Sequence, residues 1–498
     1  MGARPPSWWS SRRRVGWMFR VNRTLVGNGR YRRLATFAAD FGRVSTSSLS
    51  RWEAGLTTMP RWAARRYERL LGLPDGLLQV TADTVARYHS PPGTPTSDWI
   101  REEQVPAQLD LLDRATGDGE LSGADWYRLS GWIASEPHLV LCPNSTWTRL
   151  AERLLVEISI ADGLAWMSRA EAYHRLIAHP VGQAPAIATA VAAAADQSAQ
   201  SMIGSLSVFA ASGHRDASRA VLDQIVDPTS SRTFYGALLT SAKKLRYGHF
   251  TDQHIGALLP VLIELLGYGS WERISLAARL LRSLPPAARR RLPPRVRVLL
   301  DQVSAVDTAR TPLPPTDDPA LPLVVAEMID DPVFDVRLSA AFQIYSTPYR
   351  ATVSQTLGEE LLAEWRRRGD LDRMERILES LRVLGGPAQR RLVERMLLGR
   401  DTSPAVRDMA AYALGHIGGT STDAFLLAVI DAALRRWARD RDPHDASVLD
   451  RVVYAIGMSR RPDLLPRVLA EPDLPAPVRT AARWWLNLPD HLTRSASG

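Results

Sequence analysis

Apolar residues along most of this chain recur with the period of an α-helix. In the segment 32–41, for example, Leu34, Phe37, Ala38 and Phe41 occupy positions i, i+3, i+4 and i+7. No convincing strand-like alternation of apolar and polar residues is found. Turns rich in glycine, proline or aspartate separate helical runs that are mostly about 10–15 residues long. The pattern therefore predicts an all-α protein.

The first 90 residues contain five short helical patterns separated by turn signals. Gly27-Asn28-Gly29, Gly42, Gly55 and Leu73-Pro74-Asp75 mark the breaks, and Gly55 stands where a left-handed residue closes a helix. The predicted helices are 16–26, 32–41, 46–54, 61–71 and 76–80. We assign residues 16–82 to a small N-terminal domain.

The third of these helices is short and polar. Its large apolar residues, Leu49 and Trp52, are three apart and are expected to face the rest of the domain. Its other side carries the candidate DNA base-contacting residues, which are Thr46, Ser47, Ser50 and Arg51. Small hydroxyl side chains let a helix approach the major groove closely, and arginine can make a bidentate contact to guanine.

The segment 44–55 resembles the turn and recognition helix of XRE-type (Cro and phage-repressor-like) helix-turn-helix domains, whose pattern is roughly V-S-x-x-x-I-S-x-[IW]-E-x-G. A looser resemblance extends from residue 16 to residue 80. It implies base contacts by Thr46, Ser47 and Arg51, and roles for Glu53 and Gly55 in shaping the helix end.

The chain departs from this family pattern at two places. Leu34 stands where a glutamine is usual, and Arg43 lengthens the turn by one residue. The alternative to a DNA-binding fold is a generic helical subdomain with a chance match.

Positive charge is concentrated in the same region. Residues 1–90 contain 16 arginines, no lysine and five acidic residues, a net charge of +11, whereas residues 91–498 carry −2. This asymmetry is typical of a nucleic-acid-binding domain attached to a neutral body, although a merely soluble basic segment has it too. The candidate phosphate contacts are Arg30, Arg32, Arg33, Arg43, Arg61 and Arg65, with Arg66 beside them. Of the 62 basic residues, 60 are arginine, which indicates a GC-rich, bacterial genome. Arginine content alone is therefore weak evidence for phosphate binding.

Two segments flank this domain. Arg12-Arg13-Arg14 belong either to a solvated tail or to a flexible arm that reaches into a groove. Residues 90–97 are rich in proline, serine and threonine and are predicted to be a linker.

The remaining chain is predicted to be helical in two stretches. The first covers 98–300, a proline- and aspartate-rich hinge loop follows at 301–321, and the second covers 322–492. Seventeen predicted helices lie between residues 147 and 488, among them 199–211. The tryptophans at 126, 132, 147, 166, 484 and 485 are expected in the core, with a stacked-aromatic cage as the alternative.

A Val-Arg pair recurs at 336, 406 and 478. The spacings of 70 and 72 correspond to two units of about 35 residues. The sequence V-R-D-M-A-A-Y-A-L-G at 406–415 is similar to HEAT-type helical repeats, which implies an α-solenoid. We expect Arg337, Arg407 and Arg479 to pair with an aspartate in the turn of an adjacent repeat.

No catalytic or metal-binding constellation stands out. Cys142 is the only cysteine, which excludes a disulfide scaffold and fits a reducing cytoplasm. The closest histidine pairs are five residues apart, the wrong spacing for two ligands on one helix face, and phosphate-loop, dinucleotide and nucleophile-elbow motifs are absent. Because no apolar run of about 18 residues is present, no membrane span is expected. We predict a cytoplasmic protein that is not an enzyme, with no catalytic residue, metal or cofactor.

Three functions remain open. The first is a sequence-specific transcriptional regulator that binds double-stranded DNA, possibly as a homodimer, with a helical-repeat body that senses a protein, peptide or small molecule. The second is an interaction scaffold in which the small domain serves as a tether. The third is a HEAT-like DNA-repair glycosylase, which the net charge of −2 on residues 91–498 disfavours.

Overall fold

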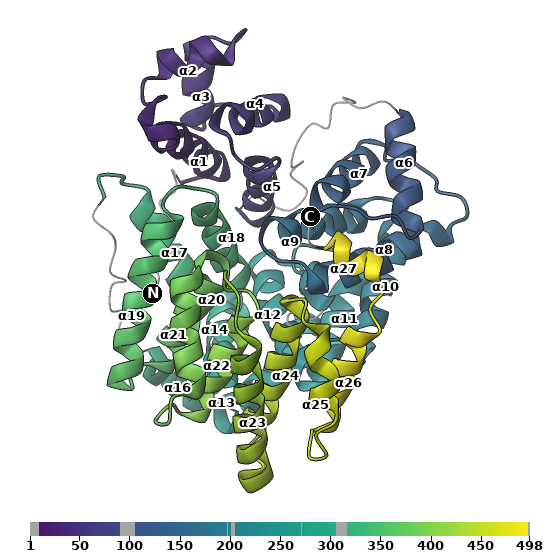
Figure 1. Cartoon of the computed structure of the whole chain (residues 1–498), viewed down its shortest axis with the longest axis vertical. Helices are drawn as coiled ribbons and strands as arrows, with labels where there is room; N and C mark the ends of the chain where they lie inside the picture. The colour runs from purple at the N-terminus through teal and green to yellow at the C-terminus, as the bar shows by residue number, and fades with distance from the viewer. Residues whose placement is uncertain are drawn as a thin grey trace.

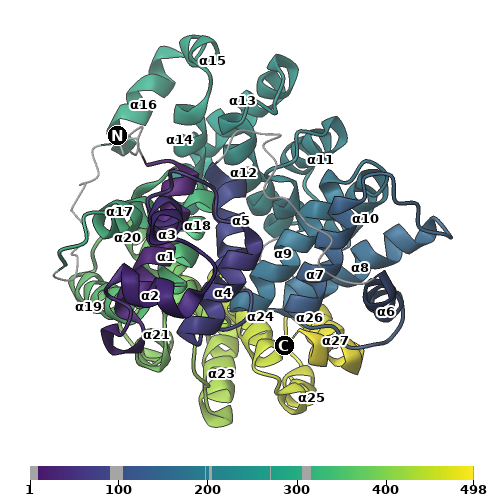
Figure 2. The same ribbon diagram turned by 90° about the horizontal axis from the view of Figure 1, so that it is seen from above.

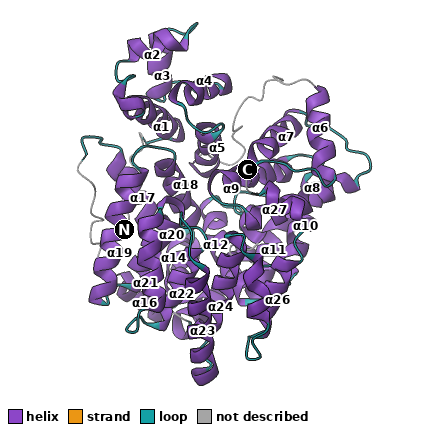
Figure 3. Cartoon of the chain, in the orientation of Figure 1, coloured by secondary structure: helices purple, strands orange, loops and turns teal. Residues whose placement is uncertain are grey.

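The computed structural model describes residues 9–89, 105–196, 198–200, 205–269, 271–304 and 316–496. Within these ranges the chain forms 27 α-helices and three short 3-10 helices, and it contains no strand (Figure 3). The prediction of an all-α protein is therefore confirmed for this part of the chain. The predicted linker at 90–97 lies outside the described residues.

The first five helices form a small unit at one end of the molecule (Figure 1). Their bounds are Ser11–Leu25 (α1), Leu34–Phe41 (α2), Thr46–Glu53 (α3), Arg61–Leu71 (α4) and Leu77–His89 (α5). Helices α3 and α4 match the predicted ranges within one residue. Two predictions were too short: α1 begins five residues before Gly16, and α5 continues nine residues beyond Val80.

The next group of helices occupies residues 105–304. Their bounds are Val105–Thr116 (α6), Gly123–Ser135 (α7), Ser145–Ile160 (α8), Gly163–Ala178 (α9), Gln183–Ala195 (α10), Arg215–Val226 (α11), Ser231–Arg246 (α12), Asp252–Tyr268 (α13), Trp271–Ser283 (α14), Pro286–Arg290 (α15) and Pro294–Ser304 (α16). Helix α11 packs on α12 and α13 packs on α14, while α11 also contacts α13 and α12 contacts α14. Buried residues of these helices form one continuous apolar core.

In this group one sequence prediction fails and another has a displaced boundary. The helix expected at 199–211 is replaced, in its described part, by the short 3-10 helix Ser205–Phe209. The hinge loop expected at 301–321 begins inside α16 and ends at the first residue of α17, Leu321. Residues 305–315 of that loop lie outside the described residues.

The last helices form two parallel rows. Their bounds are Leu321–Asp330 (α17), Phe334–Tyr345 (α18), Arg350–Arg367 (α19), Leu371–Leu384 (α20), Pro387–Leu398 (α21), Pro404–Leu414 (α22), Asp423–Asp440 (α23), Pro443–Met458 (α24), Leu465–Leu469 (α25), Ala476–Leu486 (α26) and Asp490–Ser495 (α27). Helices α18, α20, α22, α24 and α26 contact one another in succession, and α19, α21 and α23 form the second row. Small residues permit this close packing: Ala410, Ala411 and Ala413 of α22 are fully buried.

The repeated arginines have a structural role, but not the expected one. Arg337 donates to the carboxylate of Glu379 at 2.7 Å and to the carbonyl of Asp331 at 2.8 Å. Arg407 donates to the carbonyl of Thr402, and Arg479 donates to two carbonyls of the turn before its own helix. The predicted ladder to aspartates of adjacent repeats is wrong, because these guanidinium groups bind the backbone of the turn that precedes them in the chain.

The helices close into a ring when the molecule is viewed from above (Figure 2). The C-terminal helix α27 packs on α8, and Ser495 accepts hydrogen bonds from the guanidinium group of Arg169 and from the backbone N–H of Leu121. Nearby, the indole N–H of Trp485 donates to the side chain of Gln200 at 2.6 Å. On the opposite arc, α12 contacts α18.

The N-terminal unit sits on one face of this ring and is fixed to it through α1 and α5. Helix α5 packs between α9 and α18. The side-chain amide of Asn22 in α1 donates to the carbonyl of Ser346 at 2.7 Å, and the hydroxyl of Thr81 in α5 contacts the Ser346 hydroxyl at 2.6 Å. One continuous apolar core joins this unit to α17–α27. The five helices are therefore packed onto the body rather than separated from it.

Candidate nucleic-acid interface

The sequence of α3 specifies both ends of this helix. The hydroxyl of Ser45 accepts a hydrogen bond from the backbone N–H of Ser48 at 3.1 Å, which caps the N-terminus. Just after the C-terminus, Gly55 has a φ of +66°, the left-handed conformation that the sequence predicted. A Cβ atom at Gly55 would lie 2.6 Å from the backbone of Arg13, so α1 and the end of α3 are in close backbone contact.

The two sides of α3 differ as its sequence predicts. Leu49 is fully buried, and Trp52 is half-buried against Phe41 and Trp62. The four predicted base-contacting residues are all exposed: Thr46, Ser47, Ser50 and Arg51. The helix thus presents small hydroxyl groups and one guanidinium group to the outside.

A buried polar network holds α3 on the side that faces the rest of the N-terminal unit. Arg23 of α1 binds Glu53 of α3 with two hydrogen bonds, at 2.6 and 2.8 Å. The hydroxyl of Tyr67 in α4 donates to the same carboxylate at 2.9 Å. Burial, followed by the Glu53 charge, raises the pKa of Tyr67 well above its ordinary value, so this hydroxyl stays protonated as a donor. The network links three helices and fixes the orientation of α3.

The acidic residues of the N-terminal unit are mostly engaged inside it. Glu53 is paired as described, and Glu68 accepts three backbone N–H groups at the start of α5. Asp83 binds Arg61 at 2.8 Å and Arg175 at 2.7 Å. Asp40 pairs with Arg30 at 2.8 Å. Because little negative charge reaches the surface, the exposed arginines leave this unit with a positive exterior.

The predicted phosphate contacts divide into three groups. Arg32, Arg33 and Arg43 are exposed and lie in the segments that lead into α2 and α3. Arg30 is exposed but paired with Asp40, and the half-buried Arg65 lies on α4. The third group consists of Arg61 alone, whose side chain is nearly buried.

Arg61 does not match its prediction. Its side chain is only 10 % exposed, because it binds Asp83 and also the hydroxyl of Tyr127 in α7 at 3.0 Å. This placement argues against a phosphate contact and makes Arg61 a link between the N-terminal unit and the ring. No local pattern predicts this contact, because Tyr127 is 66 residues away along the chain.

The interpretation of Arg12-Arg13-Arg14 as part of a tail or arm is also wrong. All three residues belong to α1, whose N-cap is Ser10. Arg12 and Arg13 are exposed, whereas Arg14 is 1 % exposed and binds both carboxylate oxygens of Glu327 in α17. The distant Glu327 carboxylate therefore holds Arg14 in the interior, while Arg12 and Arg13 stay at the surface.

Other chemistry is not evident in the described part of the chain. It holds no group of three or more His, Cys, Asp or Glu residues arranged for a metal ion. Among its helices, none is long and apolar enough to cross a membrane. Comparison with protein-family models and with curated proteins finds no match to this chain.

Proposed function

We propose that this protein is a DNA-binding transcriptional regulator of bacteria, with α3 as its recognition helix and no catalytic activity of its own. The observation that carries the proposal is the composition of the outer face of α3: Thr46, Ser47, Ser50 and Arg51 are exposed on a capped helix held rigidly from beneath. Such a face fits the floor of a major groove, where arginine reads guanine. The resemblance of residues 44–55 to XRE-type domains supports the same assignment.

The surrounding charge suits a phosphate backbone. Arg32, Arg33 and Arg43 are exposed next to α2 and α3, and most acids of the unit are turned inward. Contacts of this kind set affinity and register, and each neutralised phosphate contributes about −0.9 to the slope of log K against log salt.

The body would position this unit rather than read DNA. Its two rows of helices are consistent with the proposed HEAT-like repeats, and the packing of α1 and α5 on the ring fixes the direction of α3. If two copies bind as a homodimer in the cytoplasm, the body would set the distance between the two recognition helices.

Selection of duplexes from a random library, at about 0.15 M salt, tests the proposal. We expect enrichment of a defined motif, probed afterwards by titration with the purified full-length protein. Arg51→Ala should weaken binding to that motif by about 5- to 150-fold and relax the preference at one base pair. Arg43→Ala should weaken all sequences alike and lower the salt slope by about 1.

Arg391→Ala is the matched control, since Arg391 is exposed on α21 of the ring. It should leave both affinity and motif unchanged. Absence of any motif, or equal binding by the Arg51→Ala variant, would refute α3 as a recognition helix.

A further inference from the structure

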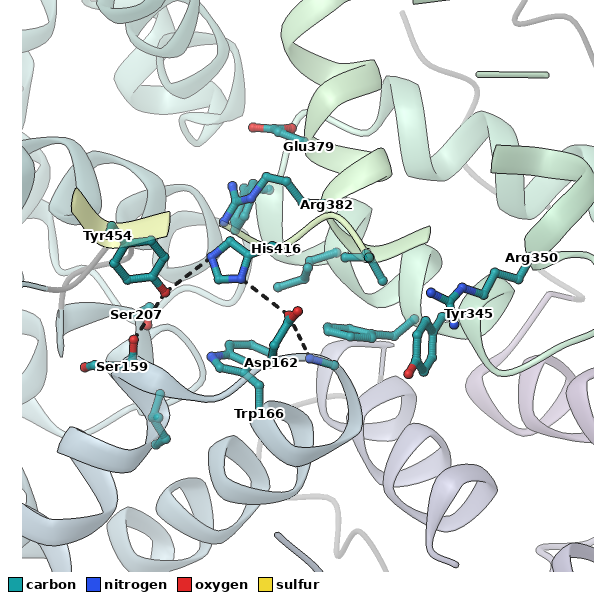
Figure 4. A pocket seen from close by; sticks show the side chains of 17 residues that line it. Ser159, Asp162, Trp166, Ser207, Tyr345, Arg350, Glu379, Arg382, His416 and Tyr454 are labelled. Carbon is teal, nitrogen blue, oxygen red and sulfur yellow. Dashed lines mark hydrogen bonds and ion pairs between the residues drawn. The ribbon is translucent and has the colours of Figure 1, made fainter. Parts of the chain in front are cut away.

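A cavity of about 150 Å³ lies at the centre of the ring, between residues of α8 and α9 on one side and residues of α18, α20 and α24 on the other (Figure 4). Its walls come from segments up to about 300 residues apart, such as Ser159 and Tyr454. A cavity of this size accommodates a single aromatic ring.

One wall of the cavity is aromatic. The rings of Trp166 and Phe342 are stacked, with centroids 5.6 Å apart and an interplanar angle of 14°. Tyr345 follows Phe342 along α18 and is covered by the guanidinium group of Arg350 at 4.4 Å. These faces suit a flat ligand, because aromatic rings favour offset-stacked or edge-on contacts with other rings.

The polar groups that line the cavity largely bind one another (Figure 4). His416 lies 3.4 Å from the carboxylate of Asp162 and 3.4 Å from the hydroxyl of Tyr454. That hydroxyl also donates to the carbonyl of Ser159 at 3.2 Å. The other lining carboxylate, Glu379, is already bound to Arg337. The negative charges of the cavity therefore have partners.

Arg382 is different from the other buried arginines of the body. It lines the cavity, is 9 % exposed, and stacks on the ring of Tyr412 at 4.0 Å. Its Nε atom has no hydrogen-bond partner, and no carboxylate or carbonyl of the described residues pairs with its guanidinium group. Because Nε is buried without a hydrogen-bond partner and no carboxylate of the described residues neutralises the group, an anion in the cavity would supply both a contact and a counter-charge.

We propose that this cavity binds a small planar carboxylate, with its carboxylate group on Arg382 and its ring beside Trp166 and Phe342. Arg382, which has no carboxylate partner among the described residues, favours an anion, the stacked rings favour a planar ligand, and the volume limits its size. This site is separate from α3, so ligand binding tests the proposal independently of DNA binding.

The test is fluorine NMR of 4-fluorobenzoate with the full-length protein. We expect line broadening that saturates with protein and that unlabelled benzoate reverses. The neutral isostere 4-fluorobenzamide should bind at least about tenfold more weakly, because hydrogen bonds between charged groups are stronger than those to a neutral amide. Cyclohexanecarboxylate and inorganic phosphate should compete poorly.

Two variants locate the binding. Arg382→Met should weaken 4-fluorobenzoate binding by at least about tenfold, whereas Arg391→Met, on the ring surface, should leave it unchanged. Circular dichroism checks that both variants fold. Equal binding of the acid and the amide by the wild-type protein would overturn the proposal whatever the variants do. Absence of binding at millimolar ligand, or full binding by a folded Arg382→Met variant, would overturn it as well.

Discussion

The ion pair between Arg14 and Glu327 should make the largest single contribution to the attachment of α1 to the ring. The two side chains are 1 % and 6 % exposed, and Nη2 of Arg14 lies 3.0 Å from Oε1 of Glu327. Burial lowers the pKa of Arg14 and raises that of Glu327, while their mutual attraction opposes both shifts. Substituting Glu327→Gln keeps the shape of the site but leaves the guanidinium group buried without a counter-charge.

The expected loss follows from this burial. Removing one partner of a buried ion pair costs about 3–5 kcal/mol, because the remaining charge has lost both water and its partner. Glu327→Gln and Arg14→Met should therefore each lower the free energy of unfolding by this amount. Replacing both residues with apolar ones leaves no charge behind, so Arg14→Met combined with Glu327→Met should cost less than either single change.

Urea denaturation followed by circular dichroism gives the free energies, and amide hydrogen exchange reports whether α1 opens first. Arg12→Met is the matched control, because Arg12 lies two residues away on the same helix, is exposed, and should change stability by less than about 0.5 kcal/mol. Single variants that lose less than about 1 kcal/mol, or a double variant that loses the sum of the singles, would refute the anchor.

Two further outcomes can be checked in the same way. Gly55→Ala should lower the melting temperature more than Gly72→Ala. Both glycines have a positive φ, +66° at Gly55 and +62° at Gly72, so the backbone strain of an alanine is similar at the two positions. A Cβ atom at Gly55 would lie 2.6 Å from the Arg13 backbone, however, whereas a Cβ atom at Gly72 would meet no atom within 4 Å. Equal melting temperatures for the two variants would contradict the close contact. Burial lowers the pKa of Lys244 to about 7, from 10.5. The folded state thus releases this proton at lower pH than the unfolded chain, so stability should rise by about 2 kcal/mol between pH 7 and pH 9. Lys244→Met should abolish that part of the rise, and an unchanged pH profile in this variant would contradict the shift.

Local signals in the sequence were sufficient for the N-terminal helices that depend on their own residues. The inward Leu49 and the left-handed Gly55 both act within a few residues of α3, so spacing and residue type revealed them. The same reasoning located helices in the second half, where apolar stripes recur along each helix.

Features that depend on distant partners could not be read in this way. The lengths of α1 and α5 follow from their burial against the ring, where Glu327 and Ser346 bind them. Nothing local indicates Asp83 and Tyr127 as partners of Arg61, so its charge alone predicts a phosphate contact. The central cavity joins residues from both halves, and no spacing rule connects Trp166 with Arg382.

The seating of α27 on α8 has a consequence for how this chain comes apart. An open array of helix pairs has two ends, and its terminal pairs can fray one after another while the centre persists. Here the last helix is held by Arg169 and by the backbone of Leu121, so the described helices offer no such starting point on the C-terminal side. Loss of one helix would have to break contacts on both of its flanks at once. The ring should therefore unfold as a single cooperative unit, and its unfolding should begin at a contact between neighbouring helices and not at a terminal helix.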